Sequence, residues 1–527
     1  MERLPMKAYR FAHGFAVVLS TALLASCGGS QSTAPQLPAA PSQSSSVRVG
    51  GGDHIRYHLV DLGTFGGPNS TICSFTPVCL PSQVLNDRGT LVGAADTSIP
   101  DPFPAFCFDG LIRLPDCYTT RAFATRNREL VRLSALSKGS AVAVSVSNND
   151  LIAGVAQNGK TDPIVPGFPE VRAALWDGDK VADLGTFGGG ETNANAVNDR
   201  GQVAGATTNT IPDPYSFIYN FLGTSNGTQT RGYLWQNGSK RDLGTLGGPD
   251  AFAVDVNERG QVAGWSYVNS TPNQGTGLPT YHPFLWQKGK MRDLGTLGGT
   301  QVYNIEGLND RGEVLGLMTL AGEQRAHPFL WNGRRLVDLG TFGGPGGDGA
   351  WINDRGEAVG WGGTTQNCPN LEGGGQHSFL WRNGVKRDLG SVPGTDNGDA
   401  SWINSKSQIV GSDFSCDATV FDAYLWEKVS IVDLNTLIPP GSQLHLFIAL
   451  AINDRGEIAG LGSLPNGDIH AVLLIPRAGE TRAAAAETSR SIAGSHTLTN
   501  RQLTTAELIA IKGILAGRHR RFMGLRH

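Results

Sequence analysis

Aspartate recurs at one position of a short repeated signature, Asp-Leu-Gly, and its spacing is the first pattern in the chain that suggests chemistry. The signature begins at Asp61, Asp183, Asp242, Asp293, Asp338 and Asp388, with a worn copy at Asp433. Carboxylates gathered around a central channel would suit a hard cation, which binds several oxygens. We favour a simpler interpretation, in which each carboxylate bonds backbone N–H groups of its own glycine loop. We therefore expect neither a metal nor a cofactor.

Histidine and tryptophan recur in a second signature, Phe-Leu-Trp with a preceding histidine. The histidines are His282, His327, His377 and His470, and Arg172, Arg231 or Asp422 replaces them in other units. We expect these side chains to form hydrogen bonds at strand edges. The in-register tryptophans are expected to pack between units: Trp176, Trp235, Trp286, Trp331, Trp381 and Trp426. Four tryptophans fall outside this register and are the better candidates for stacking on a ligand: Trp265, Trp351, Trp361 and Trp402.

Six cysteines follow Cys27, and in an exported chain such cysteines can form lasting disulfides. Cys368 and Cys416 lie in corresponding segments of successive units, so we expect them to face each other. Cys73 with Cys79, and Cys107 with Cys117, are candidates for local disulfides. Free thiols remain the alternative.

The elements that must position these residues are short strands. The chain has 71 glycines and 17% charged residues, a composition that disfavours helices because glycine weakens them. Each unit has four apolar segments separated by turns, and residues 253–299 illustrate them. Asn309-Asp310-Arg311-Gly312 is typical of the turn before the fourth segment, since its closing glycine accepts a left-handed conformation.

Eight such units occur, one of them decayed, with Arg132 in place of the aspartate. Repeated four-stranded units bury their faces best when they surround an axis. We predict an all-β fold, a β-propeller of about eight four-stranded blades closed by a C-terminal strand at residues 470–475, with flexible N- and C-terminal tails. Longer connections at 206–230, 265–281 and 361–376 replace the same link of the unit, so they should emerge on one face.

The order of these signatures resembles the HAF repeat family of bacterial extracellular proteins. The resemblance covers roughly residues 55–476 and rests on sequences such as His377-Ser-Phe379-Leu-Trp381, Asp293-Leu-Gly-Thr-Leu-Gly-Gly299 and Ile352-Asn-Asp-Arg-Gly356. The decayed unit departs from it, with Thr125 for the tryptophan and Ser147 for the asparagine. The resemblance implies an architecture and an extracellular location, and no particular reaction.

The N-terminus is typical of an export signal. Lys7 and Arg10 precede an apolar run from Phe11 to Leu24, which is short for a membrane span. Leu24-Ala-Ser-Cys27 resembles a bacterial lipobox, which predicts lipidation of Cys27, an outer-membrane or cell-surface location and a membrane contact through the lipid; secretion or a periplasmic location is the alternative. We predict a lipoprotein signal peptide at 1–26, a Ser- and Pro-rich linker at 27–50 and the propeller at 51–476.

The segment 477–527 is predicted to be a disordered linker with a short helix near residues 504–515. This segment holds nine Lys and Arg against three Asp and Glu, so the helix has a basic end that suits anionic lipid or the acidic body of the protein. A solvated tail is the alternative. We expect no binding to nucleic acid, because such binding requires basic residues that neutralise phosphates and the body of the protein is acidic.

Catalysis would require residues that break the repeat. The carboxylates Asp96, Asp101, Asp213 and Glu372 do so, but cleavage of a glycosidic bond by a carboxylate pair needs two of them within about 10 Å, and no spacing brings these together. The sequence therefore predicts a protein that is not an enzyme. It would act as a surface-anchored scaffold that binds a glycan or protein through its long loops; a polysaccharide-active hydrolase or lyase is the alternative.

Overall fold

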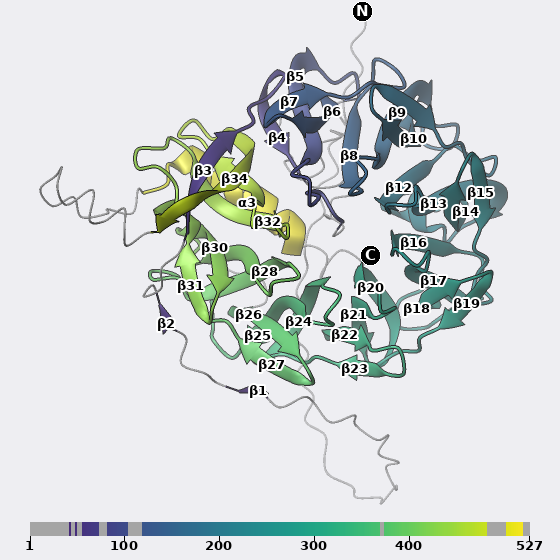
Figure 1. The fold of residues 1–527 in the computed structure, drawn as a ribbon. Coiled ribbons are helices and arrows are strands. Elements are labelled where there is room, and N and C mark those ends of the chain that lie inside the picture. The colour runs from purple at the N-terminus through teal and green to yellow at the C-terminus, as the bar shows by residue number, and fades with distance from the viewer. Residues whose placement is uncertain are drawn as a thin grey trace, which may run out of the picture. The chain divides into compact units, whose positions relative to one another are not determined.

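The computed structural model describes residues 42–43, 48–49, 55–72, 82–103, 118–368, 374–481 and 502–519. The chain divides into Met1–Pro38 and Ala39–His527, and all described residues belong to the second unit. Eight antiparallel sheets form a ring there, and the first strand of each lies nearest the centre (Figure 1). This is an eight-bladed β-propeller, as predicted.

Blades 1 to 4 follow one another along the chain, each with four strands paired in chain order. Their bounds are β4 (Gly66–Thr71), β5 (Val92–Pro100), β6 (Tyr118–Arg126) and β7 (Glu129–Arg132); β8 (Ala141–Val146), β9 (Ile152–Thr161), β10 (Pro169–Asp177) and β11 (Lys180–Asp183); β12 (Thr192–Val197), β13 (Val203–Asp213), β14 (Gly227–Gln236) and β15 (Ser239–Asp242); β16 (Ala251–Val256), β17 (Val262–Pro272), β18 (Pro279–Gln287) and β19 (Lys290–Asp293). A short helix, α1 (Phe217–Phe221), lies between β13 and β14.

Blades 5 to 7 repeat the pattern, and blade 8 combines both ends of the described chain. Their bounds are β20 (Gly298–Leu308), β21 (Val314–Leu320), β22 (Ala326–Trp331) and β23 (Leu336–Asp338); β24 (Gly343–Ile352), β25 (Ala358–Thr364), β26 (Gln376–Arg382) and β27 (Val385–Asp388); β28 (Asn397–Ile403), β29 (Ile409–Phe414), β30 (Phe421–Glu427) and β31 (Ser430–Asp433); β32 (His445–Ile452), β33 (Ile458–Ser463), β34 (Ile469–Thr481) and β3 (Ile55–Asp61). Two-residue strands β1 (Ser42–Gln43) and β2 (Arg48–Val49) pair with β27 and β31. A 3-10 turn, η1 (Leu434–Thr436), follows β31.

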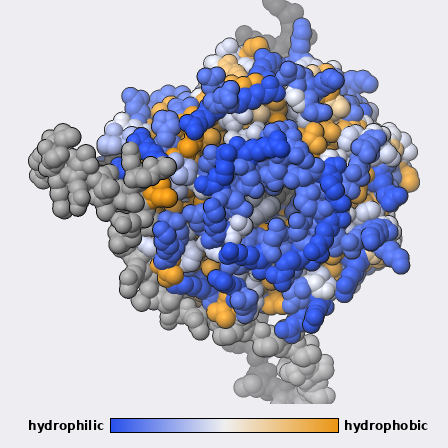
Figure 2. All heavy atoms as spheres, viewed as in Figure 1, coloured by the Kyte–Doolittle hydropathy of each residue, from blue (hydrophilic) through white to orange (hydrophobic). Residues whose placement is uncertain are grey.

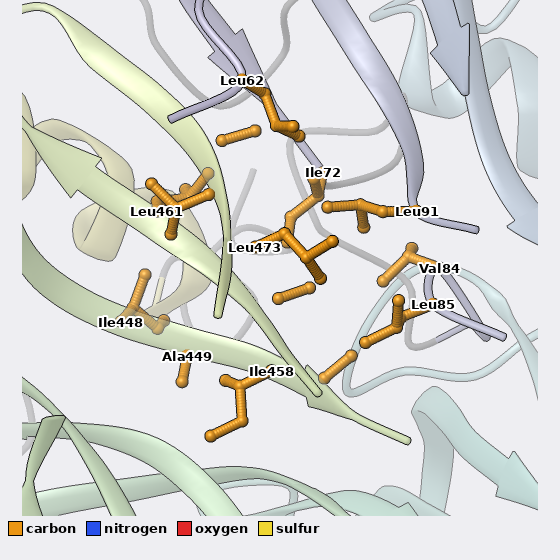
Figure 3. Packing of buried hydrophobic residues seen from close by; sticks show 14 of the residues in the cluster. Leu62, Ile72, Val84, Leu85, Leu91, Ile448, Ala449, Ile458, Leu461 and Leu473 are labelled. Atoms are coloured by element: carbon orange, nitrogen blue, oxygen red, sulfur yellow. The ribbon is translucent and has the colours of Figure 1, made fainter. Parts of the chain in front are cut away.

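Blade 8 closes the ring. Its inner three strands come from the C-terminal part of the chain, and β3 pairs antiparallel with β34 as the outer strand. The prediction that a C-terminal strand would join the N-terminal strand is thereby confirmed. Side chains of blade 1, among them Leu85 and Leu91, meet Leu461 and Leu473 of blade 8 in one hydrophobic cluster (Figure 3).

Asparagine side chains in the turns after the first strands link neighbouring blades. Asn257 Oδ1 accepts the N–H groups of Arg259 and Gln261 in its own turn, and its Nδ2 donates to the carbonyl of Asn309 in the next blade at 2.9 Å. Corresponding bonds join further pairs, and Asn453 joins the last blade to Asn86 of the first. The turn therefore serves both its own hairpin and the ring. Hydrophilic residues encircle the hollow centre of the ring (Figure 2).

A glycine in each second strand allows this close packing. A Cβ added at Gly264 would lie 2.0 Å from the carbonyl oxygen of Phe252 and 2.8 Å from the ring of Phe284. The first strand is also bulged between Ala253 and Asp255 opposite this glycine. The repeated Val-x-Gly pattern is therefore required by the backbone of the neighbouring strand and by the aromatic residue behind it.

The connection between the second and third strands emerges on the same face in every blade, because all blades share one strand order. The long connections predicted at 206–230 and 265–281 are largely continued strands, since β13 and β17 extend to Asp213 and Pro272. In the third, at 361–376, Cys368 is bonded to Cys416 of the next blade, as predicted. The sequence predicted the face correctly but not the extended form of these hairpins.

Candidate functional site

The repeated aspartates lie at the outer strand of each blade, so they do not surround the central channel. Each carboxylate accepts the N–H of the residue two positions on, for example Gly295 N–H to Asp293 at 2.7 Å. Most also pair with the histidine or arginine eleven residues earlier; His282 Nδ1 lies 2.9 Å from both carboxylate oxygens of Asp293. Partial burial opposes the effect, but the bonds from His282 and Gly295 lower the pKa of Asp293. The structural interpretation of these residues is confirmed.

Blade 7 departs from this arrangement at two positions. Asp422 stands where the other blades have histidine or arginine, and Asn435 stands where the signature has glycine. The side-chain nitrogen Nδ2 of Asn435 lies 2.9 Å from Oδ1 of Asp433 and 3.4 Å from Oδ1 of Asp422. The same amide also bonds Leu446 through both its nitrogen and its oxygen, which fixes its position. One amide thus holds two carboxyl groups side by side.

His445, the first residue of β32, lies beside this pair. Its Nε2 is 2.6 Å from the carbonyl oxygen of Phe421 and 3.3 Å from Oδ1 of Asp422. A donor at Nε2 satisfies the carbonyl and fixes the ring plane against Asp422. The side chains of His445 and Asp422 are only 12% and 8% exposed, so both are shielded from bulk water.

The pKa of Asp422 is shifted by its surroundings in blade 7. Burial, and then the charge of Asp433, raise the pKa of Asp422 to about 7. Asp413, its cross-strand neighbour, is fully buried, and burial followed by the charges of Asp422 and Asp433 raises its pKa well above the usual value. A carboxyl group that keeps its proton near neutral pH can act as a general acid.

The pair lines a cavity of about 510 Å³. Its walls come from residues 419–422, from residues 433–445 between blades 7 and 8, and from residues near the start of helix α3 (Thr505–His519). Phe421, Pro439 and Leu444 supply apolar surface, and Thr436 and Ser442 supply hydroxyl groups. The cavity lies on the same face as the long hairpins.

Helix α3 is held against blade 8. Thr504 and Glu507 form a reciprocal capping box, with Thr504 N–H donating to Glu507 at 2.7 Å. Glu507 is fully buried and also accepts from Ser463 Oγ, while Ile511 joins the hydrophobic core. The helix therefore contacts the propeller, one of the two partners expected for it. Leu503 and Leu508 also form part of the cavity wall. Among the helices of the described ranges, none is long and apolar enough to cross a bilayer.

The four off-register tryptophans lie in different surroundings. Trp351 and Trp402 stack on each other with ring centroids 3.6 Å apart, and both line a cavity of about 300 Å³ at the central channel. Trp265 is buried, stacked on Phe252 and edge-on to Phe217. Trp361 lies on β25 and is partly exposed. Their role in ligand stacking stays a prediction, and the structure places none of them in the cavity of blade 7.

Other predicted residues are not brought into one site. Asp96 and Asp101 belong to blade 1 and its connections, and Asp213 belongs to blade 3. All three are buried and hydrogen-bonded, Asp96 and Asp213 within their own blades and Asp101 to Ser140 at the start of blade 2. Five further residues lie outside the described ranges: Cys27, Cys73, Cys79, Cys107 and Cys117. Glu372 does so as well. Within the described ranges, no three His, Cys, Asp or Glu side chains gather as metal ligands.

Comparisons with known proteins return structures and no sequence relatives. No protein-family model and no curated protein matches the chain. The propeller domain of the Trilobed protease from Pyrococcus furiosus matches with a TM-score of 0.39 and 10% identity, covering 72% of this chain and 98% of that one. A polysaccharide lyase of family PL25, an ulvan lyase, gives 0.36 and 11%, covering 72% and 100%. The Trypanosoma rangeli sialidase gives 0.30 and 9%, covering 86% and 61%.

The prediction that the chain is not an enzyme is contradicted by the comparison, in which several of the structures are enzymes, a gluconolactonase and a dipeptidyl peptidase among them. That prediction assumed that no acid–base pair includes a residue that breaks the repeat, whereas Asp422 breaks it and lies beside Asp433, the repeated aspartate of the same blade. Likeness at this level shows the fold alone and transfers no activity to the chain.

Proposed function

We propose that this protein is a glycan-active hydrolase whose active site is the cavity of blade 7. The observation that carries the proposal is the pair Asp422 and Asp433, held by one amide in a cavity, with the pKa of Asp422 raised to about 7. Two neighbouring carboxyl groups, one of which holds its proton near neutral pH, are the arrangement that most glycoside hydrolases use.

In this proposal Asp422 is the general acid. Its proton passes to the glycosidic oxygen as the bond to the sugar breaks, while the carboxylate of Asp433 stabilises the positive charge that develops on the ring or activates the attacking water. His445 and Asn435 are positioning residues in this proposal, because they contact the carboxyl groups and hold them in place. The partly apolar wall with scattered hydroxyl groups suits sugar rings, which have apolar faces and polar edges.

The long hairpins supply the approach to this site. They emerge on the face where the cavity lies, so a polymeric substrate could lie across them and enter blade 7 at one bond. In this proposal the long connections, which were expected to bind a glycan or protein, bind the substrate. The HAF resemblance, with its extracellular location, is compatible with an envelope or environmental glycan as the substrate.

A glycan panel tests the proposal. The full-length protein is incubated with neutral and acidic polysaccharides, and reducing ends are measured together with the ultraviolet absorbance of unsaturated sugars. We expect new reducing ends, with activity lost in Asp433→Asn and kept in Asp293→Asn, the same position in blade 4. Unsaturated product would identify a lyase instead. Activity that is equal in both variants would contradict the assignment of the site.

We also propose that the protein is exported and anchored through an acylated Cys27. The support is the order of Lys7, Arg10, the apolar run and the lipobox-like Leu24-Ala-Ser-Cys27. Mass spectrometry of the mature protein should find Cys27 as a diacylated N-terminal residue. A mature N-terminus elsewhere, or an unmodified Cys27, would contradict the anchor without affecting the assignment of blade 7.

A further inference from the structure

A cavity of about 700 Å³ lies where blade 1 departs from the repeat. Its lining comes from blades 8, 1 and 2, on the face opposite the long hairpins, and includes Thr125. Blades 2 to 7 have tryptophan at this position, as in Trp176 and Trp286, and blade 8 has Leu474. The smaller threonine leaves open the volume that an indole ring fills elsewhere, and its Oγ1 accepts the N–H of Leu91 at 2.9 Å.

A second departure lies in the hairpin turn beside it. Asn127 and Arg128 form a two-residue turn in which both residues have positive φ, 52° and 70°. In blades 3, 4 and 6 the second position of this turn is glycine, at Gly238, Gly289 and Gly384. Such turns strongly favour glycine there, because a side chain strains the left-handed backbone. Arg128 therefore lowers the stability of the fold relative to glycine at this position. Backbone strain of this kind is common at functional sites.

Two charged groups of the lining, Arg128 and Asp177, have no ion pair among the described residues. Four arginines line the cavity, against the three carboxylates of Asp150, Asp177 and Glu457. Arg88 bonds Asp150 at 3.2 Å, Arg126 bonds Asp179 at 3.1 Å and Arg455 bonds Glu457 at 2.6 Å. Arg128 has no ion pair within the described ranges.

We propose that this cavity binds an oxyanion group, a sulfate, phosphate or carboxylate, with Arg128 as its principal cation. The planar guanidinium matches two oxygens of such a group, and the side-chain amide of Asn127 lines the same cavity as a further donor. The shared chemistry fits a free inorganic anion or an acidic sugar. The proposal does not depend on the reaction proposed for blade 7.

The proposal is tested by replacing Arg128 and Thr125 with the residues that other blades have at these positions. Titration calorimetry of the full-length protein is carried out with inorganic sulfate, inorganic phosphate, glucuronate and a sulfated disaccharide beside its unsulfated form. We expect Arg128→Gly to bind the anion roughly tenfold to a hundredfold more weakly while its melting temperature rises. Thr125→Trp should also weaken binding by filling the cavity. Tighter binding of the sulfated disaccharide than of free sulfate would identify a sugar as the source of the anion.

Val429→Gly is the matched control. Val429 occupies the same position of the same turn in blade 7, with φ 65°, and lies outside this cavity. That variant should gain stability and keep the wild-type affinity for the anion. No binding of any of these anions by the wild type, or equal affinity in Arg128→Gly, would overturn the proposal.

Discussion

Asp422→Asn is expected to lose activity and gain stability at once. The amide has nearly the shape of the carboxyl group but no proton to donate, so product release should fall by roughly 10²–10⁴-fold, the usual contribution of a general acid. The folded protein holds a proton on Asp422 up to a pH of about 7, whereas the unfolded chain releases it near the ordinary value of 3.8. Between these values the folded state binds more protons, so its free energy of unfolding falls as pH rises.

The asparagine variant lacks this titration. Urea unfolding at pH 8 should therefore find Asp422→Asn more stable than the wild type, and the advantage should shrink towards pH 4. Asp293→Asn provides the control in the opposite direction, because its bonds to His282 and Gly295 lower the pKa of Asp293 and favour the folded state at neutral pH. It should lose stability and keep activity. An Asp422→Asn variant with full activity would contradict the role of the acid.

Removal of residues 1–61 is expected to open the ring. This change deletes β3, which pairs with β34 from Tyr57 to Asp61 and leaves that strand as an exposed edge. Tyr57 is 3% exposed, and burial of one large side chain contributes about 1.5–3 kcal/mol. With the strand pairing included, the loss should reach several kcal/mol, a large part of the roughly 5–15 kcal/mol that stabilises a typical protein.

Removal of residues 1–54 is the matched control, since it keeps β3 intact. Thermal unfolding should show a large decrease in melting temperature for the longer deletion and a small one for the shorter. Exposure of the cluster between blades 1 and 8 should also increase the binding of a hydrophobic dye (Figure 3). Equal melting temperatures for the two deletions would show that β3 does not close the ring.

The architecture could be predicted from sequence because the same physical requirements recur in every blade. Glycine in the second strand, asparagine in the turn and aspartate after the outer strand each meet a local backbone demand that repeats eight times with few exceptions. The closing strand was also predictable, because the strands left over at the two ends of the array were complementary.

The candidate site escaped the same reasoning. The sequence shows Asp422 in place of histidine and Asn435 in a worn signature. A comparison of the repeats does not reveal whether such a replacement has a function. Only the fold brings both to one cavity and adds His445 from the following blade. The contact of Glu507 with Ser463 was equally hidden, because it joins a tail helix to a blade across an intervening segment.

The pH dependence of product release tests the central claim most directly. On the substrate identified by the glycan panel, wild-type activity should decline as pH rises through about 7, because Asp422 must be protonated to act as the acid. The residual activity of Asp422→Asn should lack that decline. A wild-type profile without a decline near pH 7, or the same decline in Asp422→Asn, would show that the acid lies elsewhere.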